Sequence, residues 1–172
     1  SDQSFDVYRS FTVPGYSVNL TENGVGGTGL PLGATVKATL YDRTGKLLAE
    51  GEDQVNSYGD LYIWEFTGCE RESANLQSGH VIVFQTAGQA AVTVSVPSLT
   101  LVMVATNDTL TGSAPARAKL SSLVWLAAGT TVATDIDTLQ ADGNGNFSAS
   151  FAGRFNIQAG DWGEVRYYDA QD

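Results

Sequence analysis

The sequence is poor in the residues that carry covalent or acid–base chemistry. Among its 172 residues there is one cysteine, Cys69, and one histidine, His80. A single cysteine cannot form a disulfide within the chain, so the fold must be held together without one. Because no G-x-S-x-G motif accompanies His80, the usual pattern of a nucleophile and its base is also missing. We therefore do not expect an enzyme.

Positive charge is scarce as well. Nine Lys and Arg residues stand against nineteen Asp and Glu residues, which gives a net charge of −10. Such a chain repels phosphate backbones, so no nucleic-acid partner is expected.

Long apolar runs are missing too. No run of about 18 apolar residues occurs, and no membrane span is expected. Only 16% of the residues are charged and 42% are hydrophobic. The surface must therefore be rich in neutral polar groups, which predicts an extracellular or cell-surface location.

Residue patterns that bind metals are equally sparse. The segment Asp142-x-Asn144-x-Asn146 begins like a calcium-binding loop. However, Phe147 stands where that loop needs glycine, and Gly153 stands where it needs a bidentate glutamate. We therefore interpret the segment as a hairpin turn and predict no metal and no cofactor. Oxygen ligands contributed by two loops at a domain junction stay open as an alternative.

The chain repeats itself after roughly 84 residues. The matched positions are turn glycines and alternating apolar residues, which are the residues that a β-fold needs. The matches change register only between apolar segments, as insertions in loops do. Two of them pair Phe11-Thr12-Val13-Pro14 with Val94-Ser95-Val96-Pro97 and Tyr62-x-Trp64-x-Phe66-x-Gly68 with Phe147-x-Ala149-x-Phe151-x-Gly153.

Each copy is predicted to consist of short strands and no helix. Seven strands in about 83 residues suit an immunoglobulin-like sandwich. The predicted fold is therefore all-β, with an N-terminal strand in residues 1–14 and two tandem immunoglobulin-like β-sandwich domains in residues 15–97 and 98–172. In the first copy the strands are expected at Tyr16–Leu20, Gly24–Gly27, Ala34–Tyr41, Leu47–Glu50, Leu61–Phe66, Val81–Thr86 and Ala91–Val96.

Two short segments resemble a known group of domains. The stretch from Thr28-Gly29 to Ala34-Thr35-Val36, and its partner from Thr111-Gly112 to Ala118, are similar to the T-G-x-A-P-x-x-A-x-V segment of bacterial immunoglobulin-like tandem repeats. The resemblance implies a sandwich fold and a place in cell-surface adhesins, stalks or secreted multidomain proteins. It implies no chemistry, because functions are added to such folds site by site.

The second copy lacks the counterpart of the strand Ala91–Val96, since the sequence stops at Asp172. A matching orphan strand, Asp6–Val13, stands at the other end of the chain. A domain is about 25–40 Å long, so we expect this strand not to reach the second domain of its own chain but to complete that of a neighbour. The result would be a head-to-tail filament of copies. An excerpt from a longer tandem array and an intramolecular closure are the alternatives. The donor residues would be Val7, Arg9, Phe11 and Val13.

Alternating apolar residues predict the two cores. Tyr62, Trp64 and Phe66 share one face of a strand and are expected inside. Trp162 lies in an insertion that the first copy lacks, so it is the best candidate for an exposed contact with a ligand. The residues expected to be buried are Val36, Leu40, Trp64, Phe66, Val83 and Val94 in the first domain and Val124, Phe147, Phe151, Val165 and Tyr167 in the second.

These patterns favour an extracellular structural or adhesive protein that binds copies of itself and contacts surface glycans. The alternative is a carbohydrate-binding module, or an immunoglobulin-like linker pair, of a larger secreted enzyme or adhesin. Three N-x-S/T sequons make Asn19, Asn107 and Asn146 candidate glycosylation sites if the chain meets the necessary machinery.

Overall fold

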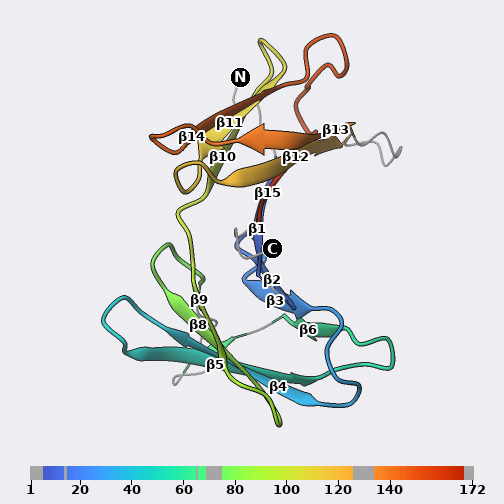
Figure 1. Cartoon of the computed structure of the whole chain (residues 1–172). Coiled ribbons are helices and arrows are strands. Elements are labelled where there is room, and N and C mark those ends of the chain that lie inside the picture. The colour runs from blue at the N-terminus through green and yellow to red at the C-terminus, as the bar shows by residue number, and fades with distance from the viewer. Residues whose placement is uncertain (1–5, 14, 65, 69–74, 126–133, 169–172) are drawn as a thin grey trace. The chain divides into compact units, whose positions relative to one another are not determined.

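The computed structural model describes residues 6–13, 15–64, 66–68, 75–125 and 134–168 (Figure 1). In these ranges the chain is all-β, as predicted, and forms fifteen strands without a helix. The described residues accordingly offer no helix long and apolar enough to cross a membrane. The chain divides into two compact units, Thr12–Ser98 and Leu99–Asp172 together with Ser1–Phe11. We refer to them as the N-terminal unit and the C-terminal unit.

The N-terminal unit contains two groups of paired strands. One runs in the order β2 (Tyr16–Asn19), β3 (Gly24–Gly27) and β6 (Leu61–Ile63). The other runs in the order β7 (Thr67–Gly68), β5 (Leu47–Gln54), β4 (Thr35–Tyr41), β8 (Val81–Thr86) and β9 (Val92–Ser95). Most of these bounds agree with the expected strands to within a residue, because alternating apolar residues and turn glycines mark them, but β5 extends four residues further, β6 ends three residues earlier and β7 was not expected.

The two groups of the N-terminal unit meet across an apolar core. The ring of Tyr16 on β2 stacks on the ring of Phe84 on β8, with centroids 4.1 Å apart. Its hydroxyl lies 2.7 Å from the hydroxyl of Thr86, so the one polar atom of the buried tyrosine has a partner. A buried tyrosine that both stacks and hydrogen-bonds fixes how the two sheets face each other.

The C-terminal unit has the same construction. One sheet runs in the order β10 (Thr100–Val104), β11 (Thr109–Ser113) and β14 (Asn146–Ser150). In the other, β13 (Thr134–Gln140), β12 (Lys119–Trp125), β15 (Trp162–Tyr168) and β1 (Asp6–Val13) are successive neighbours. Gly163 of β15 leaves room for the opposite sheet, since a Cβ there would lie only 2.8 Å from the Sδ of Met103.

The position of β1 corrects one sequence argument. We expected Asp6–Val13 to be unable to reach the second domain of its own chain, yet β1 is the hydrogen-bonded neighbour of β15. Side chains support this placement, because Ser10 donates from Oγ to Glu164 at 3.5 Å and Arg9 donates to the carbonyl of Leu99 at 3.4 Å. Eight extended residues span about 26 Å. The expectation from domain length did not take this length of the strand itself into account.

Equivalent turns recur in the two units with the same hydrogen bonds. The N–H of Leu30 donates to the carbonyl of Gly59 at 3.1 Å, and the N–H of Ala114 donates to that of Gly145 at 2.8 Å. Likewise, the Pro31 and Pro115 carbonyls accept from the residue three positions later, at 3.1 Å and 3.0 Å. The repeat in the sequence is therefore a repeat of backbone geometry.

Most of the predicted core residues are buried, with three exceptions. Val36, Leu40, Phe66 and Val94 are buried in the N-terminal unit, and Val124, Phe147, Phe151 and Val165 in the C-terminal unit. Val83 and Tyr167 are only half-buried. Trp64 is 62% exposed, so its assignment to the core was wrong.

The error at Trp64 is one of strand phase. Leu61 and Ile63 are the inward residues of β6, which turns Tyr62 and Trp64 outward. Leu61 pairs with Gly27, and Phe147 pairs with Gly112 at the same place in the C-terminal unit. The true counterpart of Phe147 is therefore Leu61 rather than Tyr62, and a shift of one residue exchanges the two faces of a strand.

Candidate functional site

The best candidate site is the outer face of the sheet β2–β3–β6. Ser17, Gly26 and Tyr62 are partners across the three strands, and Asn19 pairs with Gly24 in the neighbouring row. The inward residues Val18, Val25, Leu61 and Ile63 are all buried. We call the outward set Ser17, Asn19, Gly24, Gly26, Tyr62 and Trp64 the aromatic face.

Two parallel rings dominate the aromatic face. The centroids of Tyr62 and Trp64 lie 5.9 Å apart, and their planes differ by 6°. Tyr62 is 50% exposed and Trp64 is 62% exposed. Among the described strands, β6 is the last in the order on this side of the sheet.

Gly24 of β3 forms the floor beneath the indole ring of Trp64. A Cβ added to Gly24 would lie 3.6 Å from the Cε3 of Trp64, so the indole rests on this glycine. Gly24 is buried although it faces outward, because the ring covers it. Gly26, the partner of Tyr62, likewise carries no side chain that would stand above the sheet. The indole therefore has a low floor beneath it, and both aromatic residues are at least half exposed.

The polar groups of the aromatic face are mostly neutral. The amide oxygen of Asn19 accepts from the N–H of Thr21 and of Glu22, each at 3.0 Å. Its Nδ2 donates to a carboxylate oxygen of Glu22 at 2.8 Å, so this acid is partnered within its own turn. The exposed hydroxyl of Ser17 lies beside Gly26. These groups can exchange hydrogen bonds with hydroxyls but supply no nucleophile and base.

His80 has a structural role. Its side chain is nearly buried, and Nδ1 accepts a hydrogen bond from the N–H of Gln77 at 3.3 Å. Burial lowers the pKa of His80, the nearby carboxylate of Asp42 raises it, and Arg43 lowers it. The imidazole is thus held neutral as an acceptor that closes a turn.

Asp142 is likewise engaged by its own turn. Its Oδ1 accepts from the N–H groups of Asn144 and Asn146, both at 2.8 Å. These bonds, above all the one from Asn146, lower the pKa of the carboxyl group. The turn joins β13 to β14, which lie in different sheets, so the predicted hairpin is a corner between sheets. Within the described ranges, no group of three or more His, Cys, Asp and Glu residues could hold a metal ion.

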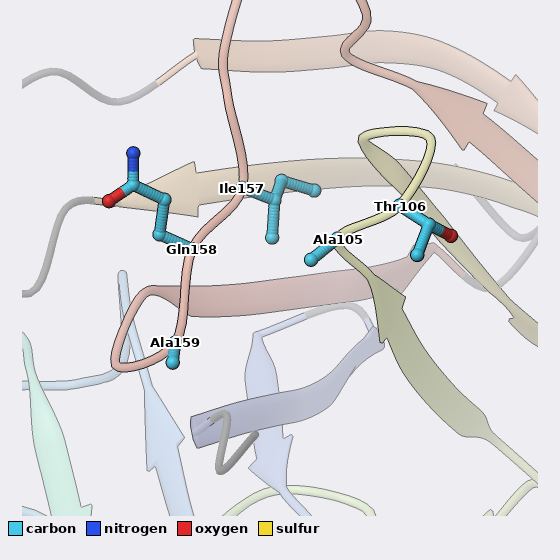
Figure 2. Close-up of a pocket in the computed structure, with 5 residues that line it drawn as sticks. All are labelled: Ala105, Thr106, Ile157, Gln158 and Ala159. Carbon is cyan, nitrogen blue, oxygen red and sulfur yellow. The ribbon is translucent and has the colours of Figure 1, made fainter. Parts of the chain in front are cut away.

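The C-terminal unit also has a hollow of about 480 Å³. Figure 2 shows its lining, with Ala105 and Thr106 after β10 and with Ile157, Gln158 and Ala159 before β15. The two segments are tied together by Asp108, whose Oδ1 accepts from the N–H of Ile157 at 2.8 Å. None of these five described lining residues has an ionisable side chain, so they offer shape but little chemistry.

The other candidate residues are dispersed. Trp162, the predicted ligand contact, begins β15 in the C-terminal unit and is 41% exposed, whereas the aromatic face belongs to the N-terminal unit. Among the sequon asparagines, Asn19 is half-buried, whereas Asn107 and Asn146 are exposed. The backbone of the proposed donor residues forms β1, but the side chains of Val7, Phe11 and Val13 lie outside the described part of the chain, as does Cys69.

Sequence reasoning named Tyr62 and Trp64 but placed them in the core. A signal for the correct assignment was present, because Leu61 and Ile63 also alternate and β3 offers glycines at alternate positions. Glycines opposite outward aromatics are a known way of covering an exposed backbone.

Comparison with known proteins gives matches only among solved structures. No protein-family model matches the chain, and a search of curated proteins finds no match. The chain is similar to a tetra-tandem repeat in the extending region of a large adhesion protein, with 16% identity and a TM-score of 0.30. That match covers 95% of this chain and 50% of the other, so the chain spans half the length of that structure.

Two further structures are similar over most of the chain. The BSP domain of a biofilm-associated protein is 16% identical, with a TM-score of 0.26, and the match covers 85% of this chain and 22% of that one. E. coli alpha-2-macroglobulin is 14% identical, with a TM-score of 0.32, over 89% of this chain and 12% of that one.

Proposed function

We propose that the protein is a structural or adhesive module of an extracellular surface. The observation that carries the proposal is the recurrence of the same turn bonds at Leu30–Gly59 and Ala114–Gly145. The features that the two units share are structural. His80 and Asp142, which could have carried chemistry, accept hydrogen bonds from the backbone of their own turns. A repeated scaffold with a largely neutral polar surface is suited to spacing and presenting contact surfaces.

We further propose that β1 can complete the C-terminal unit of a neighbouring copy. β1 lies beside β15 although more than 140 residues separate the two strands along the chain. A strand that belongs to a distant segment can be supplied by another copy without any new contact. Each copy would then donate β1 and receive β1, and the repeated contact gives an open filament.

Deletion of residues 1–13 tests this proposal. The shortened chain should be monomeric and should melt at a lower temperature, because β15 loses its neighbour. A synthetic peptide of residues 1–13 should bind the shortened chain and restore its melting temperature. A matched peptide with Ser10→Pro should restore less, since proline removes a backbone N–H and disrupts an edge ladder.

Light scattering and electron microscopy of the full-length protein at increasing concentration show whether β1 completes the C-terminal unit of its own chain or that of a neighbouring copy. Head-to-tail particles that disappear on deletion of residues 1–13 would support the filament. A full-length protein that stays monomeric at millimolar concentration, while the peptide still stabilises the shortened chain, would show that β1 serves its own chain alone. That result would end the filament proposal and leave the surface-module proposal standing.

A further inference from the structure

We propose that the aromatic face of the N-terminal unit binds a neutral, straight oligosaccharide of β-linked pyranose rings. The inference is independent of the filament, because it uses only residues of β2, β3 and β6. The residues that carry it are Tyr62 and Trp64, with Gly24 beneath the indole ring.

The rings are presented in the manner that sugar stacking requires. The indole of Trp64 lies against Gly24, and Trp64 is nevertheless 62% exposed. The face of an aromatic ring is the negative part of its quadrupole. The axial C–H groups of a pyranose carry partial positive charge and form an apolar patch of similar size. Such a patch can rest on an open ring face without losing the hydration of the equatorial hydroxyls.

The pairing of the rings favours a straight chain over a single sugar. Tyr62 and Trp64 are stacked, with planes that differ by 6° and centroids 5.9 Å apart, so they are parallel and offset rather than coplanar. In β-linked glucose the hydroxyls are equatorial, and consecutive rings form a flat ribbon with C–H groups on both faces. A straight ribbon can contact the exposed parts of both offset rings, whereas the curved chain of an α-linked glucan turns away from one of them.

The area of the face argues against a protein partner. A large aromatic side chain offers about 150–250 Å², so rings that are 50% and 62% exposed present roughly 200–300 Å² in all. A stable protein interface needs about 800 Å² on each partner. The aromatic face is therefore too small for a second copy of the chain, but it suits two or three sugar rings.

Charge and ring arrangement narrow the ligand further. A net charge of −10 disfavours an anionic glycan. A cationic ligand is usually enclosed by rings that face it from several directions, whereas Tyr62 and Trp64 lie nearly parallel. Ser17, with its exposed hydroxyl, is a neutral hydrogen-bonding group beside the rings. A neutral glycan fits these features best.

Aromatic cover of Gly24 is a second role of Trp64, and the experiment must separate it from binding. Trp64→Leu keeps an apolar side chain over Gly24 but removes the π face, and Tyr62→Leu removes the π face of the second ring. Trp64→Phe keeps a smaller π face. Trp162→Ala removes an exposed tryptophan from the C-terminal unit and serves as the matched control.

The full-length protein is titrated with cellohexaose by calorimetry, and with maltohexaose as the α-linked control. We expect weak binding of cellohexaose and no measurable binding of maltohexaose. Trp64→Leu and Tyr62→Leu should each weaken the affinity by about tenfold. Trp64→Phe should lie between these variants and the wild type, and Trp162→Ala should bind normally. Circular dichroism and melting temperature establish that each variant is folded.

Several results would overturn the proposal. One is a wild-type protein that does not bind cellohexaose at millimolar concentration. Another is equal affinity in the wild type and in folded Trp64→Leu or Tyr62→Leu. A loss of binding in Trp162→Ala alone would assign the contact to the C-terminal unit. Self-association that disappears in Trp64→Leu would assign the face to a second copy of the chain.

Discussion

His80 and Asp161 occupy the same position in their units and make the same hydrogen bond. Nδ1 of His80 accepts from the N–H of Gln77 at 3.3 Å, and Oδ2 of Asp161 accepts from the N–H of Gln158 at 2.7 Å. In both units the N–H of the accepting residue donates back to the glutamine carbonyl at 3.0 Å. The shared bond shows that the position needs an acceptor, which either side chain provides.

The first prediction concerns the pH dependence of this turn. Burial is the main cause that lowers the pKa of His80 below its usual 6.5. The unfolded chain therefore takes up the proton first as pH falls, so the stability from neutral His80 is complete above about pH 6.5 and declines below it. His80→Asn keeps an acceptor but does not titrate. Its melting temperature should match the wild type at pH 8 and fall less between pH 7 and pH 5. Parallel curves for the two proteins would contradict this assignment.

A second prediction concerns the turn at Asp142. Hydrogen bonds from Asn146 and Asn144 lower the pKa of this carboxyl below 3.8, so the stability it confers is present above that pH and is lost as the pH falls through the lowered pKa. Asn56 makes the same two bonds in the N-terminal unit, to the N–H groups of Tyr58 and Asp60, without a titrating group.

Asp142→Asn should therefore leave stability at pH 7 nearly unchanged and weaken its decline below pH 4. Asp142→Ala should lower the melting temperature at pH 7, because two N–H groups lose their acceptor. Thermal melts between pH 2.5 and pH 7 compare the three proteins. A normal melting temperature for Asp142→Ala at pH 7 would show that the side-chain bonds do not stabilise the turn.

The strands were predictable because local patterns mark them, whereas the aromatic face required tertiary information. Val92 and Val94 alternate with polar residues, and the turn glycines bound the expected segments. On β6 both phases of the alternation are apolar, since Leu61 and Ile63 interleave with Tyr62 and Trp64. Propensity cannot choose between two apolar faces. Pairing with β3 decides which face of β6 is buried, because β3 has Val25 on its inward side and glycines on its outward side.

The position of β1 was also beyond local reasoning. Its apolar pattern identified it as a strand. Its neighbour β15 is distant in the sequence, however, and the pattern of a strand does not indicate which other strand it pairs with.

The alignment of the T-G motif between the two copies also needed the strand pairing. We aligned Gly29 with Gly112, whereas pairing places Gly27 at the equivalent position, with Leu61 and Phe147 as the corresponding partners.

A third prediction follows from the close approach at Gly112. A Cβ there would overlap the carbonyl oxygen of Thr100 and lie 2.7 Å from the Cζ of Phe147. Gly112→Ala should therefore destabilise the protein by about 1–3 kcal/mol. Gly143→Ala is the matched control, because a Cβ at Gly143 meets nothing within 4 Å. Urea unfolding of both variants measures the difference, and equal stabilities would refute the packing argument.

The last prediction is a stabilising change on β12. Ser122 is fully buried, and its hydroxyl has no hydrogen-bond partner among the described residues. It stands between the buried Leu120 and Val124, so the alternation of β12 turns its hydroxyl toward the core. A buried hydroxyl without a partner costs about 1–3 kcal/mol relative to its state in water. Ser122→Ala removes that cost and leaves only a small cavity in place of the hydroxyl, so it should raise the free energy of unfolding by about 1 kcal/mol.

The neighbouring Ser121 is buried too but has a partner, so Ser121→Ala should lower the free energy of unfolding. Urea unfolding of the two single variants gives the signs, and a loss of stability in Ser122→Ala would mean that its hydroxyl is satisfied in solution.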